Sequence, residues 1–98
     1  MSKKIFIIED DVNTLSALQA QFSAKGMEVI TNNGMGEIRG ILQEISKDRP
    51  DYIILDLILP QIDGFELLGS IKSKKEEIST PVFIFTDLSD EDSRARCQ

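Results

Sequence analysis

The feature that most limits the possible folds is an alternation of short apolar runs with segments of helical periodicity. The apolar runs are residues 5–8, 27–31, 52–57 and 82–86. Runs this short, with apolar residues at successive positions, are typical of parallel strands that are buried on both faces. The alternation therefore predicts an α/β protein with a doubly wound parallel sheet, right-handed crossovers and helices on both faces of the sheet.

The segments between these runs each carry one apolar face. The apolar positions are Leu15, Leu18 and Phe22 in the first segment, Ile38, Ile41, Leu42 and Ile45 in the second, and Leu67, Leu68 and Ile71 in the third. Spacings of three and four residues place such side chains on one side of a helix. We expect Gly26 to end the first helix and Pro50 to limit the second. Ser89 and the acids that follow it predict the start of a fourth helix.

Length and composition limit the class of protein. The 98 residues suffice for one small domain, and we expect a domain over 1–98 that is incomplete at its C-terminus, because nothing follows to cover the last strand. The net charge of −6 argues against nucleic acid as a direct partner. The absence of histidine excludes zinc sites and His-based triads. The single Cys97 and the lack of a signal peptide or membrane-length apolar run predict a cytoplasmic protein that does not contact membranes.

Acidic side chains stand at the ends of two predicted strands. Glu9, Asp10 and Asp11 follow the first run, and Asp56 lies at the end of the third. The carboxyl ends of parallel strands form the ligand-binding edge of open α/β sheets, so two adjacent strands would bring these acids into one pocket. Crowded carboxylates repel one another, and Mg²⁺ relieves that repulsion. The pattern predicts a magnesium site at which an oxygen of Asp56 attacks phosphorus.

Structural roles compete with this functional interpretation at three positions. Asp56 could be a turn or capping acid, although a charge at the end of a buried strand is costly unless something offsets it. Thr86 ends the fourth run, where its hydroxyl could hold phosphoryl oxygens, or it could be a β-branched strand residue with no such role. For Asp11 we favour a solvated acid at the start of the first helix.

The motifs together resemble the receiver domain of bacterial two-component response regulators. The resemblance rests on Glu9-Asp10-Asp11, on Asp56-x-x-x-Pro60-x-x-Asp63-Gly64 and on Thr86 at the end of the fourth run. It covers the chain from Lys4 onward and implies a flavodoxin-like fold with strand order 2-1-3-4, the family's fifth strand and fifth helix being absent from this chain. It also implies a phosphorelay protein that is not a conventional enzyme, but catalyses its own aspartyl phosphorylation and dephosphorylation.

The resemblance implies roles for single residues and for a partner. Asp56 would be the phosphoacceptor, taking its phosphoryl group from a sensor histidine kinase or a phosphotransfer protein. Asp10, Asp56 and the backbone carbonyl of Ile58 would bind Mg²⁺ directly, and Glu9 would hold it mainly through water. Thr86 would bond to the phosphoryl group and couple it to the signalling surface.

Three departures from the family pattern are visible. Glu9 replaces the commoner aspartate, and Asp87 stands where the family usually has a small residue. The family's phosphate-binding lysine belongs to the fifth strand, and no lysine here takes its place. Pro60 and Gly64 are still expected to shape the loop after the acceptor, the proline by fixing φ and the glycine by permitting a tight turn.

Other interpretations remain open. A pseudo-receiver or protein-interaction module would keep the fold without phosphotransfer, and the missing lysine favours it if 98 residues is the natural length. A flavodoxin-like cofactor binder is disfavoured, because the first strand is not followed by the small residues of a phosphate-cradling loop. A haloacid-dehalogenase-type phosphatase would need an aspartate at position 58, where this chain has Ile58. A chain that truly ended at residue 98 would expose the edge of strand 82–86, which predicts edge-to-edge pairing or a segment-swapped homodimer.

Overall fold

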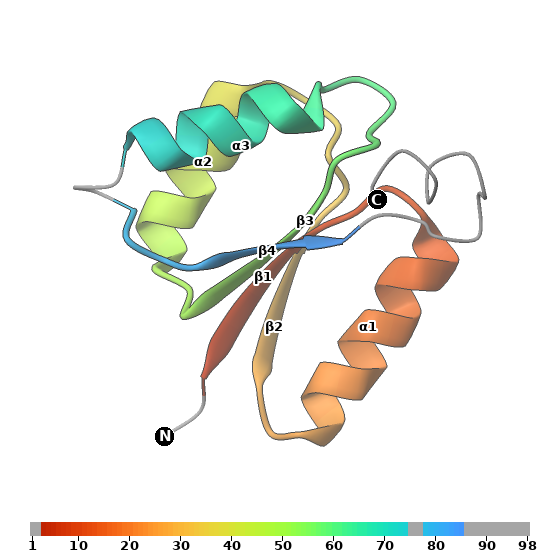
Figure 1. Ribbon diagram of the computed structural model, residues 1–98. Coiled ribbons are helices and arrows are strands. Elements are labelled where there is room, and N and C mark those ends of the chain that lie inside the picture. Colours follow the sequence, from red (N-terminus) through yellow and green to blue (C-terminus); the bar gives the residue numbers. More distant parts are fainter. Residues whose placement is uncertain (1–2, 75–77, 86–98) are drawn as a thin grey trace.

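Four parallel strands form the centre of the molecule. The computed structural model describes residues 3–74 and 78–85. Its elements are β1 (Lys4–Ile8), α1 (Val12–Ala24), β2 (Glu28–Asn32), α2 (Ile38–Asp48), β3 (Tyr52–Asp56), α3 (Gly64–Ser73) and β4 (Val82–Phe85). The strand order is β2-β1-β3-β4, with α1 on one face of the sheet and α2 and α3 on the other (Figure 1). The predicted doubly wound fold and strand order are confirmed, while Thr86 and the expected helix start at Ser89 lie outside the described residues.

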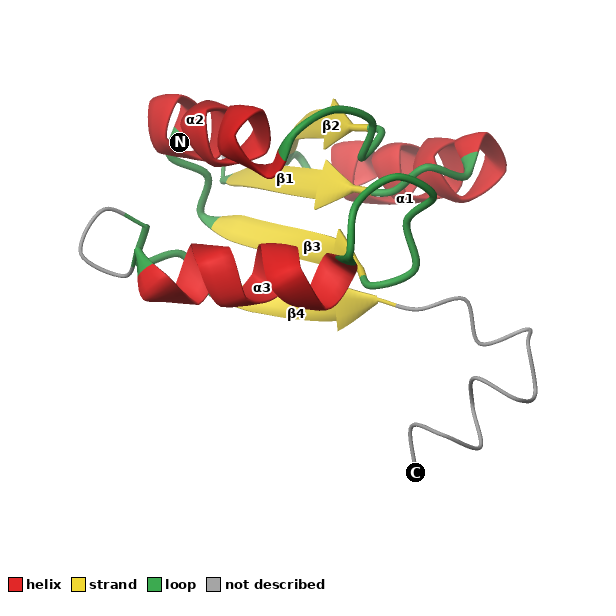
Figure 2. Cartoon of the chain, turned by 90° about the horizontal axis from the view of Figure 1, so that it is seen from above, coloured by secondary structure: helices red, strands yellow, loops and turns green. Residues whose placement is uncertain are grey.

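The strand register aligns the ends at which the acids lie. Ile8 of β1 is opposite Asn32 of β2 on one side and Leu55 of β3 on the other. β3 in turn pairs in parallel with β4, so that Asp56 is opposite Phe85. All four strands point in the same direction, and the loops that follow β1, β2 and β3 lie at one edge of the sheet (Figure 2). This shared carboxyl edge brings together segments that are distant in the sequence.

The core lies mainly between the sheet and the helix pair α2 and α3. Buried side chains of this core are Phe6, Ile8, Ile53 and Leu55 from the strands, Ile41, Leu42 and Ile45 from α2, and Leu67 and Ile71 from α3. The predicted apolar faces of the second and third helices therefore face the sheet. On the opposite face no residue of α1 is fully buried, although Leu15, Leu18 and Phe22 are half-buried as a row.

Local hydrogen bonds set the ends of the elements. The Asp11 side chain caps α1 by accepting from the backbone N–H of Thr14 at 2.9 Å, and Gly26 has a φ of 80° just after the helix. Asp11 is exposed, which agrees with the structural role expected for it. β2 begins one residue later than expected, because the N–H of Met27 donates to the carbonyl of Phe22 in the turn after α1. No helix in the described part of the chain is long and apolar enough to cross a membrane.

Candidate functional site

Three carboxylates from two neighbouring strands converge at the carboxyl edge of the sheet. Glu9 and Asp10 follow β1, and Asp56 is the last residue of β3, which pairs directly with β1. One carboxylate oxygen from each of the three residues lies within 4.8 Å of the other two. Glu9 and Asp56 are each only 4% exposed, whereas Asp10 is exposed. The acids therefore converge as the sequence predicted, and two of them are buried while Asp10 is exposed.

Asp56 is held by the strand that it ends and by the turn that follows it. Its Oδ1 accepts a hydrogen bond from the backbone N–H of Ile58 at 3.0 Å. This bond, from a side chain to the backbone two residues later, is the geometry of an Asx turn. The turn explains why β3 ends at Asp56 rather than at Leu57, the last residue of the expected strand. The sheet and the turn together fix the position of the carboxylate.

Glu9 is fixed by hydrogen bonds on both its backbone and its side chain. Its N–H donates to the carbonyl of Asn32 in β2 at 3.0 Å, and its Oε1 accepts from the backbone N–H of Asp11 at 3.0 Å. Burial raises the pKa of Glu9 to about 7, the hydrogen bond and charge of Asp56 and the charge of Asp10 add to this rise, and the N–H of Asp11 opposes it. Ionising the whole cluster at neutral pH is therefore costly without a cation.

The donor set fits a hard divalent cation. All three side chains offer oxygen, and this set provides no nitrogen or sulfur ligand. Mg²⁺ prefers oxygen ligands and usually keeps several waters while taking one or two carboxylates from the protein. Two buried acids with an exposed Asp10 beside them satisfy this requirement, because the exposed side leaves room for water. The residues present are therefore suitable for Mg²⁺.

The predicted site includes two further residues, Ile58 and Thr86, and the structure describes only the first of them. Ile58, whose carbonyl is the expected third metal ligand, lies next to the acceptor and forms an isolated antiparallel bridge with Asp63. Its side chain is 58% exposed and does not close the site. Thr86 lies outside the described residues. The role of each as a ligand or a phosphoryl contact stays a prediction.

Gly64 supports the loop in a way that differs from the expected tight turn. Its φ is not in the left-handed region, where Gly26, Gly34 and Gly36 lie. A Cβ at Gly64 would instead lie 2.4 Å from both the Cα and the carbonyl oxygen of Leu57. The glycine is thus needed for close approach of α3 to the residue that follows the acceptor.

Asp63 is the last residue of the same loop and the N-cap of α3. Its Oδ1 accepts from the backbone N–H of Phe65 at 2.9 Å and of Glu66 at 3.4 Å. This capping role is not among those expected from the sequence, where Asp63 is only part of the motif that follows Asp56. An aspartate just before a predicted helix was a sufficient signal.

Four of the large exposed apolar side chains lie in segments that follow strands at the edge of the sheet where the acids lie, and the sequence did not predict them as a group. They are Val12 at the start of α1, Met35 in the β2–α2 connection, Ile58 in the β3–α3 connection and Phe65 at the start of α3, and we call them the apolar rim. All four belong to segments that follow strands at the carboxyl edge. Periodicity could not identify them, because an exposed apolar residue in a loop leaves no periodic signal. Exposed apolar groups that gather in one region often mark an interaction site.

Comparisons with known proteins agree on one family. The family described as the response regulator receiver domain matches residues 5–98. The alkaline phosphatase synthesis transcriptional regulatory protein PhoP of Bacillus subtilis is 30% identical over 91 residues, which cover 93% of this chain and 36% of that protein. Response regulator MprA of Mycobacterium ulcerans is 29% identical over 87 residues, which cover 88% of this chain and 35% of that protein. This chain therefore spans about a third of the length of these relatives.

A solved structure gives the same result in three dimensions. Response regulator protein TrrA of Thermotoga maritima, crystallised in complex with Mg²⁺–BeF, is similar with a TM-score of 0.73 at 26% identity. The similarity covers 86% of this chain and 69% of the TrrA chain. The signal receiver domain of a LuxO repressor protein from Vibrio parahaemolyticus, at 24% identity, shares the fold with a TM-score of 0.72.

Proposed function

This chain belongs to the response regulator receiver domain family, and on that premise we propose that it takes a phosphoryl group onto Asp56 with Mg²⁺ and so switches an output. The observation that carries the proposal is the convergence of Glu9, Asp10 and Asp56 within 4.8 Å at the carboxyl edge of the sheet. A buried acid at the end of a central strand has no packing role that repays its desolvation. A reaction that needs a fixed carboxylate beside a cation explains why it is there.

Asp56 acts as the nucleophile in the proposed reaction. One of its carboxylate oxygens attacks the phosphorus of a phosphohistidine, a P–O bond forms as the P–N bond breaks, and the imidazole leaves with the electron pair and takes a proton from solvent. The N–H of Ile58 orients the carboxylate by donating to Oδ1. Holding the nucleophile in a fixed direction lowers the entropic part of the barrier.

The acids around Asp56 hold the cation in this proposal. Asp10, Asp56 and the carbonyl of Ile58 would bind Mg²⁺ directly, and Glu9 would contribute through water. When bound, Mg²⁺ neutralises charge on the transferring phosphoryl oxygens. Because the pKa of Glu9 is raised to about 7, the metal competes with a proton at Glu9 near neutral pH. The similar TrrA was crystallised in complex with Mg²⁺–BeF, which supports Mg²⁺ as the cation of this proposal.

The apolar rim supplies a docking surface for the phosphodonor in the proposal. Its four side chains belong to the segments that follow β1, β2 and β3, at the same edge of the sheet as the acids, so a partner that delivers a phosphoryl group to Asp56 would approach them. The donor is a sensor histidine kinase or a phosphotransfer protein, and we place the exchange in the cytoplasm. The hydroxyl of Thr86 is proposed to donate a hydrogen bond to a phosphoryl oxygen.

The test is phosphorylation of the full-length protein by a small phosphodonor such as acetyl phosphate. Intact-protein mass spectrometry should show one added phosphoryl group with Mg²⁺, and none with a chelator or in Asp56→Asn. Asp51→Asn is the matched control, because Asp51 immediately precedes the same strand at its other end. A phosphoryl group that is still added to Asp56→Asn would overturn the assignment of Asp56 as the phosphoacceptor. Failure of the unmodified protein to react would favour the pseudo-receiver alternative.

A further inference from the structure

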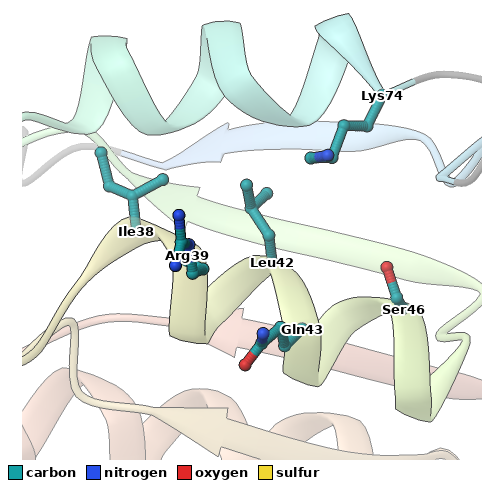
Figure 3. A pocket seen from close by; sticks show the side chains of 6 residues that line it. All are labelled: Ile38, Arg39, Leu42, Gln43, Ser46 and Lys74. Atoms are coloured by element: carbon teal, nitrogen blue, oxygen red, sulfur yellow. The ribbon is translucent and has the colours of Figure 1, made fainter.

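A groove between α2 and α3 lies apart from the carboxylates. It has a volume of about 670 Å³ and is lined by Ile38, Arg39, Leu42, Gln43 and Ser46 of α2 and by Lys74 at the C-cap of α3 (Figure 3). Ile38, Leu42 and Ser46 are spaced four residues apart, so they form one row along α2. The Lys74 side chain extends from the end of α3 over this row, and we call the site the α2–α3 groove.

The charge of the α2–α3 groove is opposite to that of the chain as a whole. Its lining combines two apolar side chains with two cations, an amide and a hydroxyl, and no acid is among its described residues. The chain itself has 17 acids and a net charge of −6. Two adjoining hollows add Arg49 and Lys72, again with no acid among the described lining residues, and one of the two shares Ser46 with the groove. The described linings of these three hollows therefore carry cations and no acid, although the protein as a whole is acidic.

Local structure does not explain the position of Arg39. It lies in the first turn of α2, where the helix macrodipole disfavours a cation. Its side chain is exposed, and its guanidinium makes no ion pair or hydrogen bond within residues 3–74 and 78–85. A cation that costs helix stability and contacts no acid in the described ranges is suited to an acid from outside.

We propose that the α2–α3 groove binds an acidic amphipathic helix of a partner protein. Apolar side chains one turn apart on the partner would pack against Ile38 and Leu42, which are themselves one turn apart. Carboxylates on one flank of that helix would pair with the Arg39 guanidinium, and Lys74 adds positive charge on the other side of the groove. A groove between two helices accepts a third helix by the same packing of side-chain rows that joins the first two.

Charge complementarity makes this occupant specific. The net negative charge of the protein repels an acidic partner, whereas the cations that line the groove and the adjoining hollows attract it, so the charge pattern favours binding at the groove. Gln43 and Ser46 can form hydrogen bonds along the edge of the bound helix without adding charge. Binding of a partner helix at this groove needs neither the metal nor the phosphoryl group of the proposed function.

The test uses three labelled helical peptides with the full-length protein, without Mg²⁺ or phosphodonor. The first carries leucines on one face and glutamates on both flanks, the second replaces glutamate with lysine, and the third is a scrambled sequence of the first composition. Fluorescence anisotropy should show saturable binding of the first peptide alone. Its binding should shift the backbone amide NMR signals of residues 38–46 and Lys74.

Charge-reversal variants show whether the first peptide binds at the α2–α3 groove. Arg39→Glu combined with Lys74→Glu should lower the affinity for the first peptide by about tenfold. Each exposed ion pair contributes modestly to binding, and charge reversal adds repulsion. Lys3→Glu combined with Lys25→Glu changes the net charge equally on other elements and should have a much smaller effect. The proposal is overturned by absence of saturable binding, by equal weakening in both double variants, by equal binding of the scrambled peptide, or by amide shifts confined to other elements.

Discussion

Polar groups at the two ends of the sheet have opposite effects on the stability of the fold. At the amino end the N–H of Lys4 donates to Oδ2 of Asp51 at 2.8 Å, and Lys4 Nζ donates to the carbonyl of Asp48 at 2.9 Å. At the carboxyl end Glu9 and Asp56 are buried beside each other with like charge. Polar groups at the first end therefore stabilise the fold. Those at the second reduce its stability in return for a site that can hold a cation.

Removing a charge at the carboxyl end should give the largest change in stability. The pKa of Glu9 rises from 4.5 to about 7 on folding, so the folded state binds this proton more tightly than the unfolded state does. Without metal, the free energy of unfolding then has its full Glu9 contribution below pH 4.5 and loses it as pH rises through about 7. Glu9→Gln should remove this loss and stabilise the protein above pH 7 by as much as about 3 kcal/mol.

Urea unfolding in the presence of a chelator measures this difference. The two proteins should be similar in stability near about pH 4.5 and should separate above about pH 7. A difference in the free energy of unfolding that stays the same at every pH would mean that ionisation of Glu9 does not destabilise this end of the sheet.

Magnesium should act on the carboxyl end and leave the amino end unaffected. A ligand that binds only the folded state at about 100 times its dissociation constant adds roughly 2.7 kcal/mol to the free energy of unfolding. Mg²⁺ should raise the melting temperature accordingly, and Asp10→Ala should abolish the rise. Differential scanning fluorimetry checks this, with Asp51→Ala as the control that keeps the full response. An equal response in Asp10→Ala would place the metal elsewhere.

The loop at the carboxyl end can be disturbed without changing charge. Gly64→Ala puts a methyl group where the Leu57 backbone lies, so we expect destabilisation of about 2 kcal/mol and a weaker stabilisation by Mg²⁺. Gly69→Ala is the matched control in the same helix, because a Cβ there has no neighbour within 4 Å. That change should stabilise the protein by up to about 1 kcal/mol. Equal effects of the two changes in denaturant unfolding would contradict the close approach.

The smallest effect is expected at the amino end. Asp51→Ala removes the acceptor of the Lys4 N–H and should cost about 1 kcal/mol of stability. Thermal or urea unfolding measures the loss, which should be the same with and without Mg²⁺. A loss that depends on Mg²⁺ would mean that the two ends are not independent.

Much of the fold could be predicted because its signals are periodic. The rows Ile41, Leu42 and Ile45 in α2 and Leu67 and Ile71 in α3 are buried as their spacing indicated. Errors fell at element ends, where single hydrogen bonds decide. The N–H of Met27 is used in a turn, and the carboxylate of Asp56 turns the backbone after β3.

The site could be predicted in part for the same reason. Glu9, Asp10 and Asp56 stand at the ends of apolar runs, and adjacent parallel strands must bring such ends together. The close contact of Gly64 with Leu57 could not be predicted, because it depends on how α3 returns to the loop after β3. The apolar rim was missed for a similar reason, since its members come from loops and helix starts that follow three different strands.

The sequence by itself determined which segments form strands and helices and which acids end the strands, because these follow from local periodicity and order along the chain. Only the tertiary structure decided that three carboxylate oxygens lie within 4.8 Å, that burial raises the pKa of Glu9 to about 7, and that Arg39 and Lys74 line one groove. Those properties depend on distances and solvent exclusion between residues far apart in the chain. Packing sets such quantities, and a linear pattern does not contain them.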